Sequence, residues 1–426
     1  MKHFAPTAPQ QLGDWLVRKR WQYATSLAVA TLLPLLFRWV LPGDYLPEAT
    51  TNSALANLAA VTIAFWARLE IEPYPGIRSS TVILPTAAAA HGLVLAFFFF
   101  TRLPYDRLGF LLGFALHVVW AYGIYFVIQR RRRLTVGVLP FGNIERLVAI
   151  DRVDWVPLPA PSLAYLRSFD ALVADLSADL TPEWEEFLAD AALQGTIVYQ
   201  VKPLEESLTG RVRIDHLSEN SFGSLVPARA YFHGKTVIDW LVALAALPIL
   251  LPVMAGAALA IRAEGGGPIL FRQTRVGHGG RPFTVLKFRT MHTGSGIADA
   301  RQAAMTGQLD PRITRVGALL RRTRIDELPQ VWNILKGQMS WIGPRPEASI
   351  LSEWYVGEIP FYRYRHVVKP GISGWAQVNQ GHVAEVDAVH EKLQYDFYYV
   401  KYFSPWLDLL ILFKTAKTMV NGFGAR

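Results

Sequence analysis

Two adjacent carboxylates, Asp326 and Glu327, stand out among the residues that could do chemistry. They lie inside the run LLRRTRIDELPQVWNILKGQMSWIGPRP, after a cluster of arginines and before the sequence Gly-Pro-Arg-Pro. A carboxylate can attack phosphorus, a second can hold a divalent cation, and guanidinium groups can neutralise phosphate oxygens. On spacing alone, such a pair is more often a helix cap and a partner of the helix dipole. The surrounding elements decide between the two interpretations.

The composition predicts a membrane-embedded protein with soluble parts. Of the 426 residues, 51% are apolar and only 18% are charged, and the length allows two or three domains. The net charge of +9 suits contact with anionic lipid or with phosphate-bearing substrates. The chain has no cysteine, which excludes disulfides, thiolate metal sites and a thiol nucleophile. The first residues lack the pattern of a cleaved signal peptide, so none is expected.

Four apolar stretches in the first third of the chain each approach the ~20 residues that a helix needs to cross a bilayer. They cover residues 21–41, 52–68, 80–101 and 106–128. Basic residues precede the first stretch and follow the last, which by the positive-inside rule places both ends in the cytoplasm. The loop 101–107 carries two arginines on the expected outer side, which counts mildly against this topology. We expect a four-helix transmembrane bundle within residues 1–129.

The sequence pattern of residues 130–227 predicts a small Rossmann-like α/β domain on the cytoplasmic side. Apolar runs at 134–139, 169–176 and 196–201 are typical of buried strands, and residues 182–195 have helical spacing. Alternation of strand and helix favours an α/β sheet. The turn after the first strand, PFGNIE, lacks the Gly-x-Gly-x-x-Gly pattern that lets backbone approach a pyrophosphate. This absence favours a structural or regulatory role over dinucleotide binding.

The third expected domain, residues 228–426, begins with a long apolar stretch at 235–262. Pro248 and Pro252 lie near its middle, and each removes a backbone donor and clashes with the preceding turn, which predicts a sharp break. A straight crossing would put everything after Arg262 outside the cell. A bent helix that enters and leaves on one face keeps the rest cytoplasmic. We therefore expect a re-entrant helix, with a kinked span as the alternative.

A strongly basic region follows this helix. Between Arg262 and Glu327, twelve basic side chains stand against five acidic ones. In residues 312–323 the apolar side chains share one helical face and most arginines take the other, which predicts a helix lying in the membrane interface. This charge suits membrane docking and phosphate binding equally, and nucleic acid is a third candidate without a recognised binding fold.

Two further segments add polar groups. Residues 268–291 predict a strand, a glycine-rich turn and a second strand ending at Lys287 and Arg289, a hairpin able to aim two cations at one anion. In KPGISGWAQVNQG, Trp375 and Gln377 suit stacking on and hydrogen bonding to a base. Each signal is weak by itself.

Together these pieces resemble the bacterial sugar transferase family, the polyprenyl-phosphate phosphoglycosyl transferases with a re-entrant membrane helix. The matching stretches are FRQTRVGHGGRPFTVLKFRTM, DPRITRVGALLRRTRIDELPQVWNILKGQMSWIGPRPE, KPGISGWAQVN and DLLILFKTAKTMVNGFGA. They occur in the family's order, and the DELPQ…GPRP block is the most specific. The leading helices and the α/β insert resemble the large multi-span members that initiate exopolysaccharide or O-antigen synthesis. The implied fold class is membrane α plus α/β, with an α+β catalytic domain, a re-entrant helix and interfacial amphipathic helices.

The resemblance implies transfer of a sugar 1-phosphate from a UDP-sugar to undecaprenyl phosphate, with UMP released, on the cytoplasmic face of the bacterial inner membrane. By motif, Asp326 would be the nucleophile that becomes a phosphosugar ester, and Glu327 would ligate Mg²⁺. The other matched positions, with roles in binding phosphate or substrate, are Arg321, Arg345, Lys287, Arg289 and Asp310. Membrane lipid is a further expected partner, a homodimer is expected from the resemblance alone, and no nucleic acid is expected.

Two departures from the family pattern bear on this interpretation. Relatives commonly have a polar residue before the proline that breaks the re-entrant helix, whereas Leu247 stands here, so the bend can depend on the second proline. After WAQVN many relatives read Gly-Arg, but this chain has Gln380-Gly381-His382, so substrate contacts there cannot be transferred.

Two other function classes remain as alternatives. A glycosyltransferase would move the sugar alone and release UDP, but the Asp-x-Asp expected on its nucleotide-binding fold is missing from the sequence. A membrane scaffold or regulator would use the α/β domain to bind a ligand and would have no chemistry at Asp326.

Overall fold

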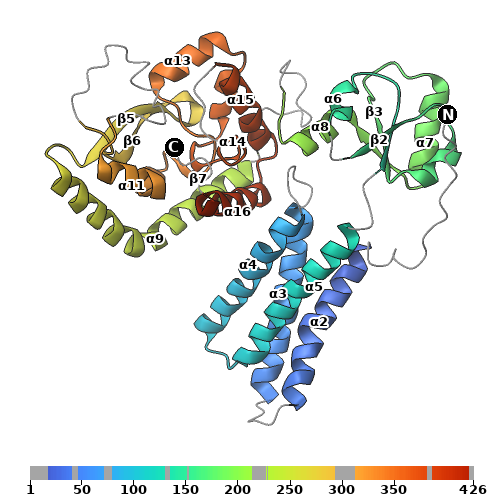
Figure 1. The fold of residues 1–426 in the computed structure, drawn as a ribbon, viewed down its shortest axis with the longest axis horizontal. Coiled ribbons are helices and arrows are strands. Elements are labelled where there is room, and N and C mark those ends of the chain that lie inside the picture. The colour runs from blue at the N-terminus through green and yellow to red at the C-terminus, as the bar shows by residue number, and fades with distance from the viewer. Residues whose placement is uncertain are drawn as a thin grey trace. The chain divides into compact units, whose positions relative to one another are not determined.

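The computed structural model describes residues 18–40, 47–71, 79–129, 135–150, 153–213, 227, 229–292, 312–380 and 386–421. The chain forms two compact units, Met1–Gly210 and Arg211–Arg426. The first contains four long apolar helices and a parallel sheet, and the second contains a fifth long apolar helix followed by short helices and strands (Figure 1).

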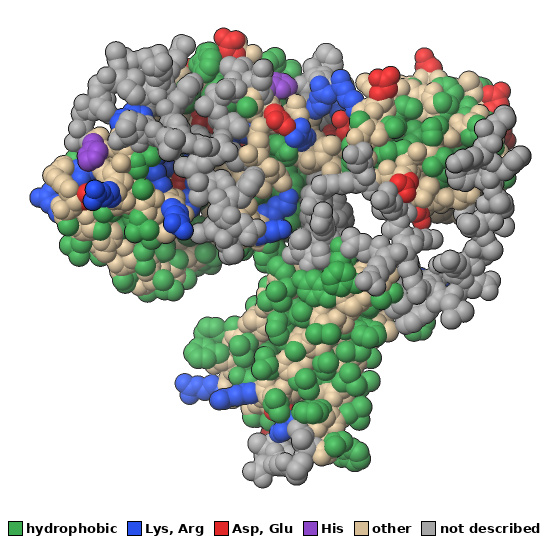
Figure 2. All heavy atoms as spheres, in the orientation of Figure 1, with side chains coloured by type: hydrophobic (Ala, Val, Ile, Leu, Met, Phe, Trp, Pro, Cys, Tyr) green, Lys and Arg blue, Asp and Glu red, His purple; other side chains and the backbone are tan. Residues whose placement is uncertain are grey.

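The first unit opens with four long helices that pack side by side (Figure 1). They are α2 (Lys19–Val40), α3 (Pro47–Ile71), α4 (Ser79–Thr101) and α5 (Arg107–Gln129). Each contains a segment long and apolar enough to cross a membrane. Small side chains such as Ala56, Ala60 and Ala90 let the helices approach closely, while hydrophobic side chains cover the outside (Figure 2). The four predicted apolar helices are confirmed, and α3 is longer than its apolar run.

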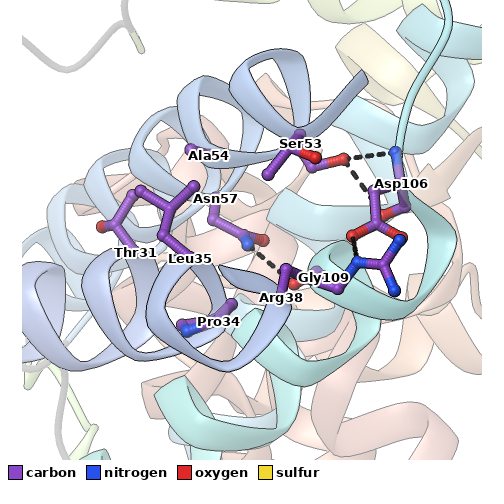
Figure 3. Close-up of a pocket in the computed structure, with 10 residues that line it drawn as sticks. Thr31, Pro34, Leu35, Arg38, Ser53, Ala54, Asn57, Asp106 and Gly109 are labelled. Atoms are coloured by element: carbon purple, nitrogen blue, oxygen red, sulfur yellow. Dashed lines mark hydrogen bonds and ion pairs between the residues drawn. The ribbon is translucent and has the colours of Figure 1, made fainter. Parts of the chain in front are cut away.

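Polar contacts join three of these helices near one end, around a small pocket (Figure 3). Arg38 Nε lies 2.8 Å from Asp106 Oδ2, and Asn57 Nδ2 donates to the Gly109 carbonyl at 3.2 Å. Ser53 Oγ accepts from the Asp106 backbone N–H at 2.8 Å. These contacts satisfy polar groups that apolar neighbours would leave without partners.

The same unit contains a four-stranded parallel sheet in the order β2-β1-β3-β4. The strands are β1 (Thr135–Val138), β2 (Asp154–Pro157), β3 (Ala171–Ala174) and β4 (Ile197–Gln200), with helices α6 (Glu145–Val148), η1 (Leu163–Ser168), α7 (Pro182–Leu193) and α8 (Val201–Thr209). The three predicted strands and the predicted helix are confirmed. Strand β2 was not predicted, because its side chains are largely exposed at the sheet edge and form no apolar run.

Ligands of parallel sheets usually bind at the carboxyl ends of the strands where the strand order reverses, here between β1 and β3. A carboxylate of the chain itself occupies this position. Asp175 Oδ2 accepts from the Asn143 backbone N–H at 3.2 Å, and a Cβ on Gly142 would lie only 2.3 Å from the same oxygen. This charge would repel a pyrophosphate, in keeping with the missing Gly-x-Gly-x-x-Gly turn, and the structural or regulatory role expected for this domain stays a prediction.

The second unit begins with α9 (Arg229–Glu264), which is helical throughout and bends near its middle in Figure 1. Pro248 and Pro252 lie inside it, so the predicted sharp break is present only as a bend. Ala243, Met254 and other small or flexible residues of α9 pack into a core with the following elements. The rest of the helix exposes large apolar side chains.

Salt bridges and hydrogen bonds fix the first half of α9. Lys235 Nζ lies 2.8 Å from Asp408 Oδ2, and Asp239 Oδ2 accepts from Ser340 Oγ at 2.6 Å. Tyr399 Oη donates to Asp408 Oδ1 at 2.8 Å. The arm of α9 that precedes the prolines is therefore tied by buried charges to elements far along the chain.

Short elements follow α9. The antiparallel hairpin β5 (Leu270–Val276) and β6 (Pro282–Phe288), joined through η3 (His278–Gly280), confirms the predicted hairpin. The remaining elements are α11 (Arg315–Thr323), η4 (Ile325–Gln330), α12 (Val331–Leu335), β7 (Ser340–Ile342), α13 (Ser349–Glu358), η5 (Tyr362–Val367), β8 (Gly371–Ser373), α14 (Trp375–Asn379), α15 (Val386–Lys401) and α16 (Pro405–Asn421). Strands β7 and β8 pair in parallel.

Candidate active site

The two adjacent carboxylates lie in the first turn of η4, which begins at Ile325. Arg324, the residue before this helix, ends α11 in the left-handed region with φ of 59°, a conformation that non-glycine side chains adopt at a cost. No side-chain capping bond forms at the start of η4. The pair therefore does not cap the helix, whereas its first-turn position suits a partner of the helix dipole. The contacts of each carboxylate decide between the two interpretations.

Glu327 is a buried carboxylate held by two cations. Its Oε1 lies 2.7 Å from Lys287 Nζ and 2.8 Å from Arg345 Nη2, and only 6% of the residue is exposed. Burial alone would raise the pKa of Glu327, but the charges of Arg345 and Lys287 outweigh it and hold this pKa well below its usual range. Glu327 is therefore ionised and fixed in place.

Asp326 lies in a different environment although it is the next residue. Its Oδ1 is buried and accepts no hydrogen bond from any residue that the structure describes. Burial, and then the neighbouring charge of Glu327, raise the pKa of Asp326. A desolvated carboxylate oxygen without a donor is more reactive than a hydrated one, because no hydrogen bonds must be broken before it attacks.

Lys287 and Arg345 reach this site from separate elements. Lys287 comes from β6, and burial lowers its pKa to about 8. Arg345 comes from the Gly-Pro-Arg-Pro turn after β7, where the charge of Glu327 raises its pKa. The structure thus brings together Asp326, Glu327, Lys287 and Arg345.

Arg289 and Arg321 make other contacts. Arg289 donates to the carbonyls of Gly266 and Gly265 at 2.8 and 3.1 Å, at the end of α9. Arg321 Nε donates to Thr290 Oγ1 at 2.9 Å. Their contacts stabilise the turn after α9 and the junction of β6 with α11.

Trp375 and Gln377 lie in α14, and the tryptophan is not free to stack on a base. Only 1% of Trp375 is exposed, because Tyr398 stacks on one side and Lys414 Nζ lies 4.4 Å from the ring centroid. Gln377 Nε2 donates to the Ile372 carbonyl at 2.9 Å, while its Oε1 is buried without a partner among the described residues. Asp310, the remaining predicted position, lies outside the described residues.

A second buried group of charges, which sequence reasoning missed, lies next to the Arg345 turn. Glu347 pairs with Lys392, and Arg365 Nη2 lies 2.7 Å from Asp396 Oδ2. Lys392 and Asp396 share one face of α15, four residues apart. No local motif marks these residues, because Glu347 and Lys392 are 45 positions apart and Arg365 and Asp396 belong to different helices.

This group predicts that the protein loses stability in acid. Burial alone would raise the pKa of Glu347, but Lys392 and Arg365 outweigh it and hold that pKa well below its ordinary 4.5. A depressed folded-state pKa gives stability that is present above the unfolded-state value and is lost as the pH falls. We expect the melting temperature of the purified protein to fall between about pH 5 and pH 3, and to fall less steeply in Glu347→Gln. The control is Glu353→Gln on the exposed side of α13, and equal slopes in wild type and Glu347→Gln would contradict the prediction.

The geometry suits attack by a carboxylate on a phosphate ester. One carboxylate is free to react, and the second is fixed beside it among cations that can neutralise phosphate oxygens. Among the described residues, no group of three or more metal-ligating side chains occurs. At most two carboxylates of the described residues could therefore hold one metal ion here.

Comparison with known proteins agrees with the motifs. Residues 230–422 match the family model for Bacterial sugar transferase. A protein of Aeromonas hydrophila named UDP-N-acetylgalactosamine-undecaprenyl-phosphate N-acetylgalactosaminephosphotransferase is 43% identical over 400 residues, which cover 93% of this chain and 94% of that protein. The UDP-glucose:undecaprenyl-phosphate glucose-1-phosphate transferase of Caulobacter vibrioides is 40% identical over 201 residues, 47% of this chain and 74% of that protein. The enzyme of the same name from Escherichia coli is 42% identical over 190 residues, 44% of this chain and 40% of that protein.

The similarity to the Aeromonas protein extends well beyond the residues that the family model matches, and the family predicted from the motifs is confirmed. The chain belongs to the bacterial sugar transferase family.

Proposed function

We propose that this protein transfers a sugar 1-phosphate from a UDP-sugar to undecaprenyl phosphate and releases UMP. The names of its relatives support the two substrates. The observation that carries the proposal is the contrast between neighbouring carboxylates, since Asp326 has a buried oxygen without a donor while Glu327 is fixed by Lys287 and Arg345.

The reaction proceeds in two displacements at one phosphorus atom. An oxygen of Asp326 attacks the phosphorus that bears the sugar, the bond from that phosphorus to the bridging oxygen breaks, and UMP leaves with that oxygen. A phosphate oxygen of undecaprenyl phosphate then attacks the same phosphorus and displaces the carboxylate. The products are an undecaprenyl diphosphate sugar and UMP, and the enzyme is returned unchanged.

The cations serve the phosphate that is transferred. Phosphoryl transfer needs alignment and neutralisation of charge more than it needs acid–base help. Lys287 and Arg345 already lie beside the two adjacent carboxylates, Asp326 and Glu327, which are called the dyad from here on. Both cations can turn toward phosphate oxygens. Arg324 is the nearest further cation, 4.0 Å from Glu327 Oε2.

The donor atoms at the dyad fit Mg²⁺. This ion is commonly bound by one or two carboxylates together with substrate phosphates. Oδ1 of Asp326 is buried without a donor among the described residues. Lys287 and Arg345 both contact Oε1 of Glu327, and only the more distant Arg324 faces Oε2, so Oε2 would be the oxygen to hold the metal. When bound, Mg²⁺ would supply Lewis-acid stabilisation of phosphate charge.

Identification of the released nucleotide tests the proposal. Membranes containing the protein are supplied with undecaprenyl phosphate, Mg²⁺ and a panel of UDP-sugars that includes UDP-N-acetylgalactosamine and UDP-glucose. We expect UMP with at least one donor and none after chelation of the metal. Release of UDP would instead identify a glycosyltransferase, and no nucleotide with any donor would favour a scaffold or regulator.

We further propose that α2 to α5 cross the bacterial inner membrane four times, and that α9 enters and leaves it on the cytoplasmic face. The bend at the two prolines and the exposed apolar side chains of α9, such as Ile249 at 72% exposed, support this arrangement. It keeps the dyad in the cytoplasm, where UDP-sugars are made, beside the membrane that contains the lipid acceptor.

Single cysteines test the re-entrant helix. The natural chain has no cysteine, and both His233 and Ala263 are exposed, one at each end of α9. We expect His233→Cys and Ala263→Cys to react with a membrane-impermeant maleimide only when the cytoplasmic side is open. Labelling of the two positions from opposite sides would mean that α9 crosses the membrane.

A further inference from the structure

The turn that holds Arg345 cannot be stabilised by its own backbone. Pro344 and Pro346 have no N–H group, so Arg345 supplies the only backbone donor of the three residues. Four consecutive carbonyls of this segment instead accept hydrogen bonds from other elements. The donors are Gly371 N to Pro344 O at 3.0 Å, Arg365 Nη2 to Arg345 O at 2.8 Å, Arg275 Nη1 to Pro346 O, and Val276 N to Glu347 O at 3.1 Å.

Two of these donors are guanidinium groups that are themselves fixed. Arg275 Nε and Nη2 both donate to Gln273 Oε1, at 3.1 and 2.9 Å. Arg365 is only 3% exposed and donates from Nη1 to Tyr362 Oη at 2.9 Å, while its Nη2 also faces Asp396. A planar guanidinium with several bonded donors has one orientation, so each fixes the carbonyl that it holds.

The carbonyls that Arg365 and Arg275 hold belong to two consecutive peptide units, which meet at the Cα of Pro346. The first unit carries the Cα of Arg345 at its start, and the Arg345 side chain leads from it to Glu327. A shift of this peptide unit would therefore move the Arg345 guanidinium relative to the dyad.

We propose that Arg275 and Arg365 are positioning residues, which act through Arg345 to place its charge on Glu327 beside Asp326. This inference rests on the proposed function, because its effect is read as a rate of UMP release. We assign both a positioning role because the guanidinium donors named above are already bonded to the carbonyls of this turn, to Gln273 and to Tyr362.

A double-mutant cycle separates positioning from general support of the fold. The first variant is Arg365→Lys, which keeps the positive charge opposite Asp396 but loses the planar guanidinium group and its fixed set of N–H donors. The second is Gln273→Met. Gln273 is partly exposed, and this change removes the Oε1 acceptor that orients the Arg275 guanidinium. Each is made in the wild type and in Arg345→Ala. Single-turnover UMP release is measured with enzyme in excess over a radiolabelled UDP-sugar, at enzyme concentrations high enough that the rate no longer rises with enzyme, which detects slow rates and removes binding from the comparison.

We expect each variant to slow UMP release by about 10- to 100-fold in the wild type, since small displacements of catalytic groups have effects of this size. In Arg345→Ala the same changes should alter the rate by no more than about 2-fold, because the Arg345 side chain through which they act on the dyad is already absent. The controls Arg363→Lys on η5 and Arg272→Lys on β5 are exposed neighbours on the same elements and should leave the rate unchanged.

Equal fold losses in the two backgrounds would overturn the inference, because the arginines would then support the fold independently of Arg345. Melting temperatures of all variants identify any that fail to fold. If Arg365→Lys fails to fold, Gln273→Met at its partly exposed position still tests the inference. Absence of UMP release by the wild type would contradict the proposed function and not this assignment.

Discussion

Asp326→Asn is expected to lower UMP release by on the order of 10⁴-fold or more, as removal of a nucleophile does in other covalent enzymes. Asparagine has the same shape, but its amide oxygen carries no full charge and does not form the phosphosugar ester. The side chain makes no salt bridge with any described residue and Oδ1 has no hydrogen-bond partner among them, so the fold should persist. The measurement is UMP release by the purified variant alongside its melting temperature.

The matched control is Glu358→Gln, which removes an acidic charge from the exposed end of α13. It should keep wild-type activity and stability. If Asp326→Asn turned over at a normal rate, the carboxylate would not be the nucleophile. If both activity and folding were lost, Asp326 would be a structural residue.

Glu327→Gln is expected to lower both activity and stability. The change leaves Lys287 and Arg345 buried without their counter-charge, and loss of one partner of a buried ion pair typically costs about 3–5 kcal/mol. Activity should fall by on the order of 10³-fold, because the neutral amide no longer holds Lys287 and Arg345 in place and is a poor ligand for Mg²⁺. Denaturation midpoints and UMP release measure the two effects.

The double variant Glu327→Gln with Lys287→Met separates these effects. Removing the lysine relieves one unpaired charge, so part of the lost stability should return, while activity should not. Recovery of activity in the double variant would mean that Glu327 serves only to neutralise Lys287. Unchanged stability in Glu327→Gln would contradict the buried ion pairs themselves.

Much of the fold could be predicted because its elements have strong local signals. The four apolar stretches, the strands β1, β3 and β4 and the hairpin ending at Lys287 are each specified by residues close together in sequence. Strand β2 was missed because it has only four residues, begins with an aspartate and ends at a proline. The prolines of α9 predicted a sharp break, whereas the helix bends there and stays continuous, packed against the core of its own unit.

The DELPQ…GPRP block alone identified the dyad and the family, whereas the contacts that hold the residues around the dyad could not be predicted from sequence. Trp375 was expected to face a substrate, but an aromatic side chain in a polar segment gives no signal of its burial, and Tyr398 and Lys414 cover it. Arg275 and Arg365, which donate to carbonyls of the Arg345 turn, lie 71 and 20 positions from their partners, so only folding brings them to this turn. Isolated arginines in a basic chain are indistinguishable by sequence from surface charges.

The most direct test supplies the protein with its UDP-sugar donor and withholds undecaprenyl phosphate. The first displacement then stops at the enzyme, and mass spectrometry of the intact protein and its peptides should find one sugar phosphate on Asp326 for each UMP released. Addition of the lipid acceptor should remove this mass and yield the undecaprenyl diphosphate sugar. Formation of that product at the normal rate, with the polypeptide unmodified at every time point, would contradict a covalent intermediate on Asp326.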